Sequence, residues 1–353
     1  MRRLIMVLAA VLIFSAIGSA QTTWYVPDDF SKIQDAISNA SVIDGDTIIV
    51  RPGTYVENID FLGKAIALKS KHGPEITIID GGNPSDPDYG STVIFQNGEN
   101  SSSKLQGFTI TNGSGTYTPW KDYSGGGIFC YYSSPIIMNN IIKNNIAERG
   151  SGICCENSLS IIVNNIIIEN SAVYNGGGIH CGASSPSIIN NTIYGNAGGL
   201  GGGGFCGYQS SPTFVNSILW DNNATLGSEI FLGGVNPYTF KISFSDVKGG
   251  KNKAYVEPAV TCIWGFGMID ANPLFVDPIN HDFHLTFASP CIDIGDNNAP
   301  SIPIIDFEGD PRVVQGLAPG CGRMIHQVCS PPQSGIVDMG ADEYCVIKHH
   351  GLK

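Results

Sequence analysis

The sequence predicts an all-β fold, a single-stranded parallel β-helix in which short strands wind into a solenoid. The first observation is a glycine-rich block that recurs as GGGIFC at 125–130, GSGICC at 150–155, GGGIHC at 176–181 and GGGGFC at 201–206. The second is that isoleucine-rich runs follow each block and are separated by Gly, Ser and Asn, which is typical of strands and turns. A period of 25 to 26 residues leaves no room for a crossover helix. Each repeat should therefore form one coil that advances about 4.8 Å along the stack.

Three rows of side chains keep the same register through these repeats, and we interpret all three as structural ladders. They are the cysteines Cys130, Cys155, Cys181 and Cys206, the asparagines Asn139, Asn164, Asn190 and Asn216, and the asparagines Asn145, Asn170, Asn196 and Asn222. The cysteines should share the inward face with the isoleucines two residues earlier, with Gly204 in the fourth isoleucine place, and we expect mostly free, buried thiols. Each asparagine amide should bond to its copy one coil away and to turn backbone.

Residues 1–20 are expected to be a secretory signal peptide, because two arginines precede an apolar run that is too short to span a bilayer and that ends in small residues. Its removal takes away Arg2 and Arg3 and shifts the net charge from −12 to −14. An acidic chain without a basic cluster argues against nucleic acid and anionic membrane surfaces as partners. We expect a monomer without a transmembrane span, secreted or at the cell surface.

The solenoid itself is expected over residues 21–288, with roughly ten coils. Asp28 and Asp29 precede an apolar pattern of Phe30, Ile33 and Ala36, which predicts an amphipathic helix near 28–40. Because an open sheet edge must be covered, this helix should cap the first coil.

Residues 289–353 are expected to form a closing module at the other end. Cys321 and Cys329 are close in a segment rich in Pro and Gly, which makes them the disulfide candidates. Asp293, Asp296, Asp306 and Asp310 are numerous enough to raise calcium as a possible ligand, although no segment has a full calcium-ligand spacing and turn or capping roles for Asp are commoner.

Three stretches carry a resemblance to known families. The opening GDTIIVRPGTYVENIDFLGKAIALKS resembles the start of the pectin-lyase-like, right-handed β-helix superfamily. The repeats, with a glycine block followed by Ile142-x-x-Asn145 and its copies, are similar to the GGAI/FxxN repeats of polymorphic outer-membrane proteins. Residues 244–344, with FSDVKGG, DFHLTFASPCIDIGD, DFEGDPR and VDMGADEY, resemble the closing region of bacterial choice-of-anchor β-helix proteins. Those proteins often continue into a sorting tail, whereas this sequence ends in CVIKHHGLK, so simple secretion is the expectation.

The resemblance implies an architecture that hosts lyases, hydrolases, esterases and binding proteins alike. Sequence motifs of polygalacturonases and pectin methylesterases are not visible. A lyase would need one base and a metal site, and the charged or polar candidates for it are Lys143, Glu148, Arg149, Glu156 and His180. His180 falls in the row of Phe129, Cys154 and Phe205 and should point outward. The alternative is that it is simply stacked in an aromatic row.

Residues 112–124, NGSGTYTPWKDYS, are an insertion that carries aromatic side chains. Flat aromatic rings can stack on the apolar faces of sugars, so the ligand-binding candidates are Tyr117, Trp120, Lys121, Tyr123, Tyr131, Tyr132 and Tyr208. The alternative is that these rings pack the insertion onto the stack. The function we expect is binding of, or adhesion to, an extracellular polysaccharide. The competing hypotheses are a polysaccharide lyase that uses calcium-assisted β-elimination, and a purely structural surface protein.

Overall fold

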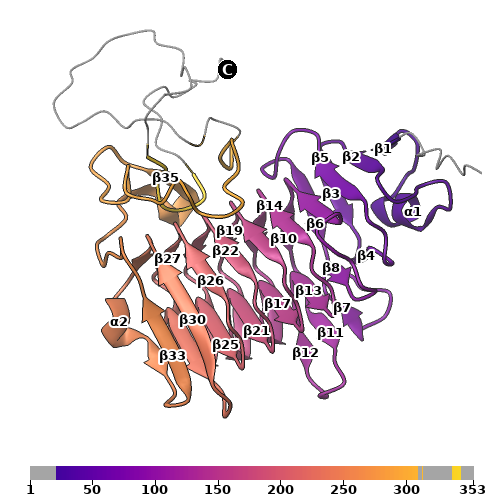
Figure 1. The fold of residues 1–353 in the computed structure, drawn as a ribbon. Coiled ribbons are helices and arrows are strands. Elements are labelled where there is room, and N and C mark those ends of the chain that lie inside the picture. The colour runs from indigo at the N-terminus through magenta and orange to yellow at the C-terminus, as the bar shows by residue number, and fades with distance from the viewer. Residues whose placement is uncertain (1–20, 309–311, 313–335, 343–353) are drawn as a thin grey trace, which may run out of the picture.

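The computed structural model describes residues 21–308, Arg312 and residues 336–342. The expected signal peptide, Asp310 and the disulfide candidates Cys321 and Cys329 lie outside these residues. The described chain winds as a parallel β-helix, and strands of successive coils lie side by side along the stack (Figure 1). The predicted fold class is confirmed.

Two sheets meet at the turn that contains the Asn139 row. Sheet A has ten strands, which agrees with the expected number of coils: β1 (Thr23–Val26), β2 (Thr47–Val50), β5 (Ala67–Ser70), β9 (Lys104–Gln106), β14 (Ile136–Met138), β18 (Ile161–Val163), β22 (Ser187–Ile189), β26 (Thr213–Val215), β30 (Tyr238–Ser243) and β33 (Val260–Trp264). Sheet B contains β3 (Gly53–Val56), β6 (Thr77–Asp80), β10 (Thr109–Thr111), β15 (Ile141–Lys143), β19 (Ile166–Ile168), β23 (Thr192–Tyr194), β27 (Ile218–Trp220) and β31 (Asp246–Val247).

The other two sheets carry the glycine-rich blocks and the strands that lead into them. Sheet C contains β4 (Ile59–Asp60), β8 (Val93–Phe95), β13 (Ile128–Tyr131), β17 (Ile153–Glu156), β21 (Ile179–Gly182), β25 (Phe205–Tyr208), β29 (Ile230–Gly233) and β32 (Tyr255–Val256). Sheet D contains β7 (Tyr89–Gly90), β11 (Gly115–Tyr117), β12 (Tyr123–Ser124), β16 (Ile146–Arg149), β20 (Ser171–Asn175), β24 (Ala197–Gly201) and β28 (Asn223–Leu226). Sheet D therefore adds a fourth strand to the three expected per coil. The expected insertion contributes the antiparallel hairpin β11–β12 to this sheet.

The inward face of each strand is apolar and fully buried. In sheet C this row consists of Val93, Ile128, Ile153, Ile179, Phe205 and Ile230. Branched and aromatic side chains fit the pleated surface and fill the interior of the coils. The buried row joins those of sheets A and B in one continuous core along the stack.

The fourth repeat is displaced by one residue from the register expected above. Ile179 pairs with Phe205 rather than with Gly204, and His180 pairs with Cys206 rather than with Phe205. The spacing of this repeat is 26 residues, not 25. The additional residue falls within the run 201–204, where four glycines carry no side chain that could identify the register from sequence.

The cysteine row is corrected by the same displacement. Cys130, Cys155 and Cys181 stack on the inward face, but Gly207 continues their row. Cys206 lies on the opposite, outward face of β25. Within the described residues every cysteine is free, including these four.

One asparagine row forms a continuous ladder inside the stack. The Asn145 Nδ2 donates to Asn170 Oδ1 at 2.9 Å, and the same bond links Asn170 to Asn196 and Asn196 to Asn222. Each amide also bonds to turn backbone, as where Asn145 Nδ2 donates to the Ile110 carbonyl at 3.1 Å. The ladder ends on Glu229, whose carboxylate accepts from the backbone and side chain of Asn222.

The other predicted asparagine row does not form an internal ladder. Asn139, Asn164, Asn190 and Asn216 adopt positive φ values of 52° to 55° at the sharp turn between sheets A and B, a conformation that asparagine tolerates better than most residues. The residues that follow them, Asn140, Asn165, Asn191 and Ser217, form the second ladder instead.

The Asn139 row contacts the closing segment. Its Nδ2 groups donate to carbonyls of Asp306, Ile305, Asp338 and Asp296, in the order of the four coils. Apolar residues of the segment, among them Phe283, Phe307 and Ala341, pack on sheet B. The described closing residues thus lie along the side of the solenoid (Figure 1).

The two ends of the solenoid are short elements. Helix α1 (Ile33–Ser38) lies within the range predicted for a cap, and buries Ile33, Ala36 and Ile37 against the first coils. After α2 (Gly250–Lys253) and β33, the chain leaves the stack. The hairpin of β34 (Phe275–Asp277), η1 (Pro278–Asn280) and β35 (Asp282–Leu285) belongs with the closing segment, so the solenoid ends before the expected residue 288.

The end of the Asn145 ladder should respond to pH. Burial raises the pKa of Glu229 to about 8, although hydrogen bonds from Asn222 oppose the shift. Because the folded state holds this proton more tightly than the unfolded state, stability should fall as pH rises from about 4.5 through 8. Glu229→Gln keeps an acceptor for Asn222 without charge, so the variant should be more stable than wild type by about 2–4 kcal/mol at pH 9.

Denaturant unfolding at pH 5 and pH 9 measures this difference, with the exposed Glu75→Gln as the matched control. Equal pH profiles for the wild type and Glu229→Gln would contradict a proton held at the end of the ladder.

Candidate functional site

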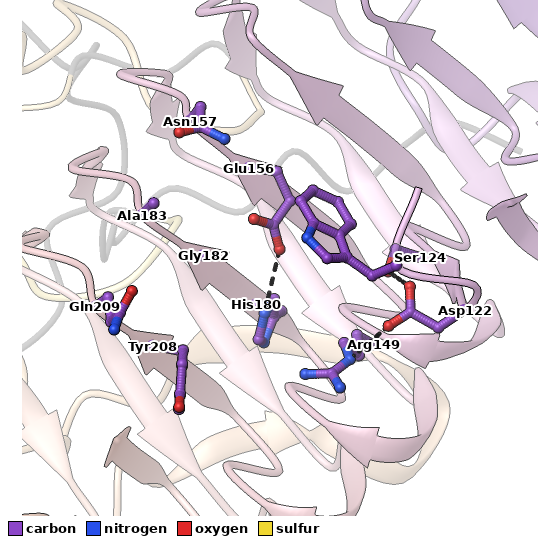
Figure 2. Close-up of a pocket in the computed structure, with 11 residues that line it drawn as sticks. Asp122, Ser124, Arg149, Glu156, Asn157, His180, Gly182, Ala183, Tyr208 and Gln209 are labelled. Atoms are coloured by element: carbon purple, nitrogen blue, oxygen red, sulfur yellow. Dashed lines mark hydrogen bonds and ion pairs between the residues drawn. The ribbon is translucent and has the colours of Figure 1, made fainter. Parts of the chain in front are cut away.

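A shallow cleft lies on the outward face of sheet C, over β17, β21 and β25. Its volume is about 280 Å³ (Figure 2). The lining residues are Trp120, Asp122, Ser124, Arg149, Glu156, Asn157, His180, Gly182, Ala183, Tyr208 and Gln209. The insertion and the stacked repeats both contribute to it.

His180 occupies the floor of the cleft. It alternates with the inward Ile179 and Cys181 along β21 and points outward as predicted, but only 2% of the residue is exposed. Its neighbours in the row are Cys154 and Cys206. The ring is therefore a buried polar group that needs a partner.

Glu156 is that partner. The His180 Nε2 lies 3.5 Å from Glu156 Oε1 (Figure 2). Burial alone would lower the pKa of His180, but Cys206 and the Glu156 carboxylate raise it to about 10, so the ring carries a proton at neutral pH. The Glu156 carboxylate fits because its neighbour in the row is Gly182, where an added Cβ would lie 2.2 Å from Oε2.

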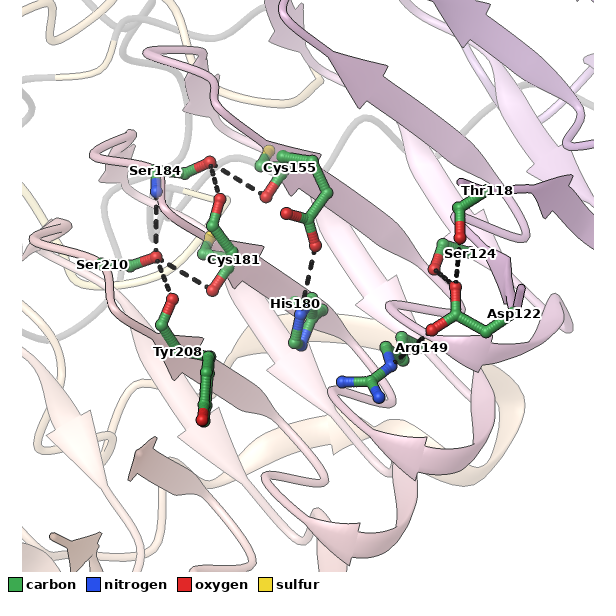
Figure 3. Close-up of polar contacts among 12 residues, drawn as sticks. Thr118, Asp122, Ser124, Arg149, Cys155, His180, Cys181, Ser184, Tyr208 and Ser210 are labelled. Atoms are coloured by element: carbon green, nitrogen blue, oxygen red, sulfur yellow. Dashed lines mark hydrogen bonds and ion pairs between the residues drawn. The ribbon is translucent and has the colours of Figure 1, made fainter. Parts of the chain in front are cut away.

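A second ion pair forms one wall of the cleft. Arg149 Nε donates to Asp122 Oδ2 at 2.8 Å (Figure 3). Asp122 also accepts from the hydroxyls of Thr118 and Ser124 at 2.6 and 3.2 Å. Because three groups hold this carboxylate, the hairpin fixes the position of the arginine.

A ladder of serines holds the ends of the sheet C strands. Ser184 Oγ donates to the carbonyls of Cys155 and Gly182, and Ser210 Oγ donates to those of Cys181 and Tyr208 (Figure 3). The last residues of these strands, which form the upper part of the cleft, therefore have fixed backbone positions.

The aromatic candidates divide into two groups. Trp120 and Tyr208 line the cleft, with exposed fractions of 52% and 44%. The Trp120 ring packs edge-on against Tyr131 at 5.8 Å, and Tyr132 packs against Tyr131 in turn.

The remaining candidates from the insertion lie outside the cleft. Tyr117 and Tyr123 contact each other, with ring centroids 5.2 Å apart, and neither lines it. Lys121 adopts a positive φ in the hairpin loop.

Of the five catalytic candidates, the structure brings Arg149, Glu156 and His180 together. Lys143 follows the inward Ile142 on β15 and belongs to sheet B. The Glu148 carboxylate accepts from the Tyr123 backbone amide at 2.8 Å and faces a different depression.

Residues of the cleft that were not candidates are Asp122, Ser124, Asn157, Gly182, Ala183 and Gln209. The alignment of the repeats contained a signal for Gly182, which shares a row with Glu156. For Asp122 no signal existed, because its arginine partner is 27 residues away on another strand.

The three described aspartates of the calcium hypothesis have other contacts. Asp296 accepts from the Asn298 amide in a turn, Asp306 accepts from the Glu308 amide, and the Asp293 backbone bonds to Asp338. Within the described residues these aspartates do not form a shared set of three ligands. Both acids that line the cleft are paired with cations, so we derive no chemical step through calcium there.

Comparisons with known proteins give a family of unknown function and a short match to a surface protein. Residues 61–207 match the family described as "Protein of unknown function (DUF1565)". A cell surface glycoprotein of Methanothermus fervidus is 42% identical over 69 residues, which are 19% of this chain and 12% of the glycoprotein. The match thus spans about an eighth of that relative. Within the described residues, no helix has the length and apolar character needed to cross a membrane.

Solved structures similar to this one include two enzymes of pectin metabolism. The pectate lyase Pel9A has 14% sequence identity and a TM-score of 0.42, with 92% of this chain and 97% of that chain covered. Pectin methylesterase from carrot has 12% identity and a TM-score of 0.37, with 73% and 84% covered. The solenoid described above confirms the resemblance to the pectin-lyase-like superfamily at the level of the fold.

The His180–Glu156 pair should contribute to stability. Glu156→Ala leaves a buried imidazolium unpaired and should destabilise by about 3 kcal/mol near neutral pH. The double variant Glu156→Ala/His180→Phe should recover most of this loss, because Phe129 already occupies the same row.

The pH dependence has a defined sign. Since folding raises the pKa of His180 from 6.5 to about 10, the contribution of the pair should be full near pH 6.5 and lost as pH rises through about 10. Denaturant unfolding of wild type and both variants at pH 6.5, 8 and 10 measures it. A cost of Glu156→Ala that does not change with pH would exclude a charged His180.

Proposed function

We propose that this protein is exported or surface-exposed and binds an extracellular polysaccharide in the cleft over sheet C. The observation that supports this most directly is the pair of exposed rings, Trp120 and Tyr208, beside a floor of fixed polar groups. Aromatic rings with an exposed face and neighbouring hydrogen-bonding groups match the alternating apolar and polar surface of a sugar.

The polar groups of the cleft favour binding over chemistry. Glu156 and His180 neutralise each other, and Asp122 is fully occupied by Arg149, Thr118 and Ser124. Arg149 uses Nε for Asp122, and Figure 2 shows the far end of its guanidinium extending away from that carboxylate. These N–H groups can donate to sugar hydroxyls or to a uronate carboxylate.

The surface location rests on weaker support. The 69-residue match is to a protein named as a cell surface glycoprotein. The apolar start of the sequence has the features of a signal peptide, and the acidic composition is compatible with an extracellular environment. Tight anchoring is not part of this proposal.

A polysaccharide lyase is the second candidate, because Arg149, Glu156 and His180 come from successive strands and share one cleft. In β-elimination a base removes the proton next to the uronate carboxyl group, and the bond to the neighbouring sugar breaks to leave a double bond. An arginine or histidine could act as the base only after its carboxylate partner had moved. This requirement ranks the lyase below the binding protein.

Loss of the tryptophan platform should weaken binding. We expect Trp120→Ala and Tyr208→Ala each to reduce affinity for the bound polysaccharide by roughly tenfold, in keeping with about 1 kcal/mol or more for a stacked ring. Affinity electrophoresis against a panel of neutral and uronate polysaccharides measures this. Tyr117→Ala is the matched control, since Tyr117 is also 44% exposed but lies outside the cleft.

The same panel, with and without calcium, distinguishes the two candidates. A lyase creates an unsaturated product that absorbs in the ultraviolet, and a rise in absorbance that Arg149→Ala abolishes would replace the binding proposal by the lyase. Binding to no polysaccharide, or equal loss in Tyr117→Ala and Trp120→Ala, would reject the cleft as a sugar site.

A further inference from the structure

A second cleft lies between sheet B and the closing segment, on another side of the solenoid. Its volume is about 260 Å³, and its lining includes Ile141 and Ile166 of sheet B. Three residues at its edge, His284, Glu308 and Asp342, come from three separate parts of the closing segment. None of them contributes to the proposed polysaccharide site.

These three side chains converge on one point. One ligand atom from each lies within 4.8 Å of the others. The His284 Nε2 is 3.1 Å from Glu308 Oε2 and 3.7 Å from Asp342 Oδ2. This spacing allows a single ion to contact all three at the usual distances of about 2.0–2.2 Å.

The imidazole is oriented from behind. Its other nitrogen, Nδ1, is hydrogen-bonded to the carboxylate of Asp282, two residues earlier on β35. Metal-binding histidines commonly have such a carboxylate partner, which fixes the ring and directs the free nitrogen at the ion. Here Asp282 directs Nε2 at Glu308 and Asp342.

Asp342 supplies an independent sign of a missing partner. The residue is only 8% exposed, and its Oδ2 atom, the one nearest His284, has no hydrogen-bond partner. A buried carboxylate oxygen without a donor is costly unless a cation neutralises it. Burial and the neighbouring Asp306 raise the pKa of this carboxyl, in agreement with incomplete compensation of its charge.

We propose that His284, Glu308 and Asp342 bind a divalent transition-metal ion of the zinc type. One imidazole with two carboxylates suits such an ion, whereas calcium and magnesium prefer oxygen ligands throughout. Water from the adjoining cleft would complete the coordination. The ion would join β35 to the two later parts of the closing segment, close to where Phe283, Phe307 and Ala341 pack on sheet B.

The competing account is an ion-pair network in which a proton on His284 balances the carboxylates. Both accounts use the same contacts, but they differ in what the protein takes up. A metal site binds one ion per chain with an affinity that depends on all three ligands, and a proton network binds none.

The test uses the full chain, stripped of metal with a chelator and then dialysed free of it. Titration with zinc chloride by calorimetry should show one site per chain, and zinc should raise the thermal unfolding midpoint. Asp342→Asn and Glu308→Gln should each weaken zinc binding by roughly tenfold or more. Glu308 is partly exposed, so its variant should fold even if Asp342→Asn does not.

Two controls separate this site from adventitious binding. Glu169→Gln removes the partner of His281, which forms another histidine–carboxylate pair at 3.1 Å, and should leave zinc affinity unchanged. Replacement of His349 and His350 by alanine tests the two adjacent histidines near the end of the sequence and should also have no effect. Absence of zinc binding in the wild type, or unchanged binding in Glu308→Gln, would overturn the proposal.

Discussion

The structure depends on the need to hydrogen-bond turn backbone that is enclosed between coils. A solenoid with short turns encloses N–H and C=O groups that water cannot reach, and each would be costly if left unpaired. The Asn145 ladder meets this need with one residue per coil, because its amide both donates to and accepts from the next copy. Since the ladder tolerates little displacement, it fixes the register of all four sheets. The aligned strands of sheet C, and hence the cleft above them, follow from that register.

Much of the fold could be predicted because a repeat records its own contacts in sequence. Residues one period apart stack, so the inward isoleucines and the Asn145 row could be identified without knowledge of distant contacts. The error at Cys206 arose where this record is weakest. The asparagines around it are spaced by 26 residues and the cysteines by 25, and four consecutive glycines allow either alignment. Backbone hydrogen bonds between Ile179 and Gly204 show that the asparagine spacing is correct.

The sites could be predicted less well because their residues do not all follow the repeat. Glu156, His180 and Arg149 lie on repeated strands, and their proximity was foreseen from that fact. Asp122, which fixes Arg149, comes from an insertion with no counterpart in other coils. The cluster at His284 is assembled by chain segments that fold back along the solenoid, and periodicity contains no information about such long-range contacts.

The positive-φ asparagines at the turn between sheets A and B have a consequence for how this architecture could change over evolution. Repeat proteins commonly gain or lose whole units, since each contacts only its neighbours. Here four consecutive units each present one amide to a different carbonyl of the closing segment. Deleting or duplicating a unit among them would leave the two partners unequal in length. The number of central repeats should therefore be constrained, while units nearer the N-terminus are freer to vary.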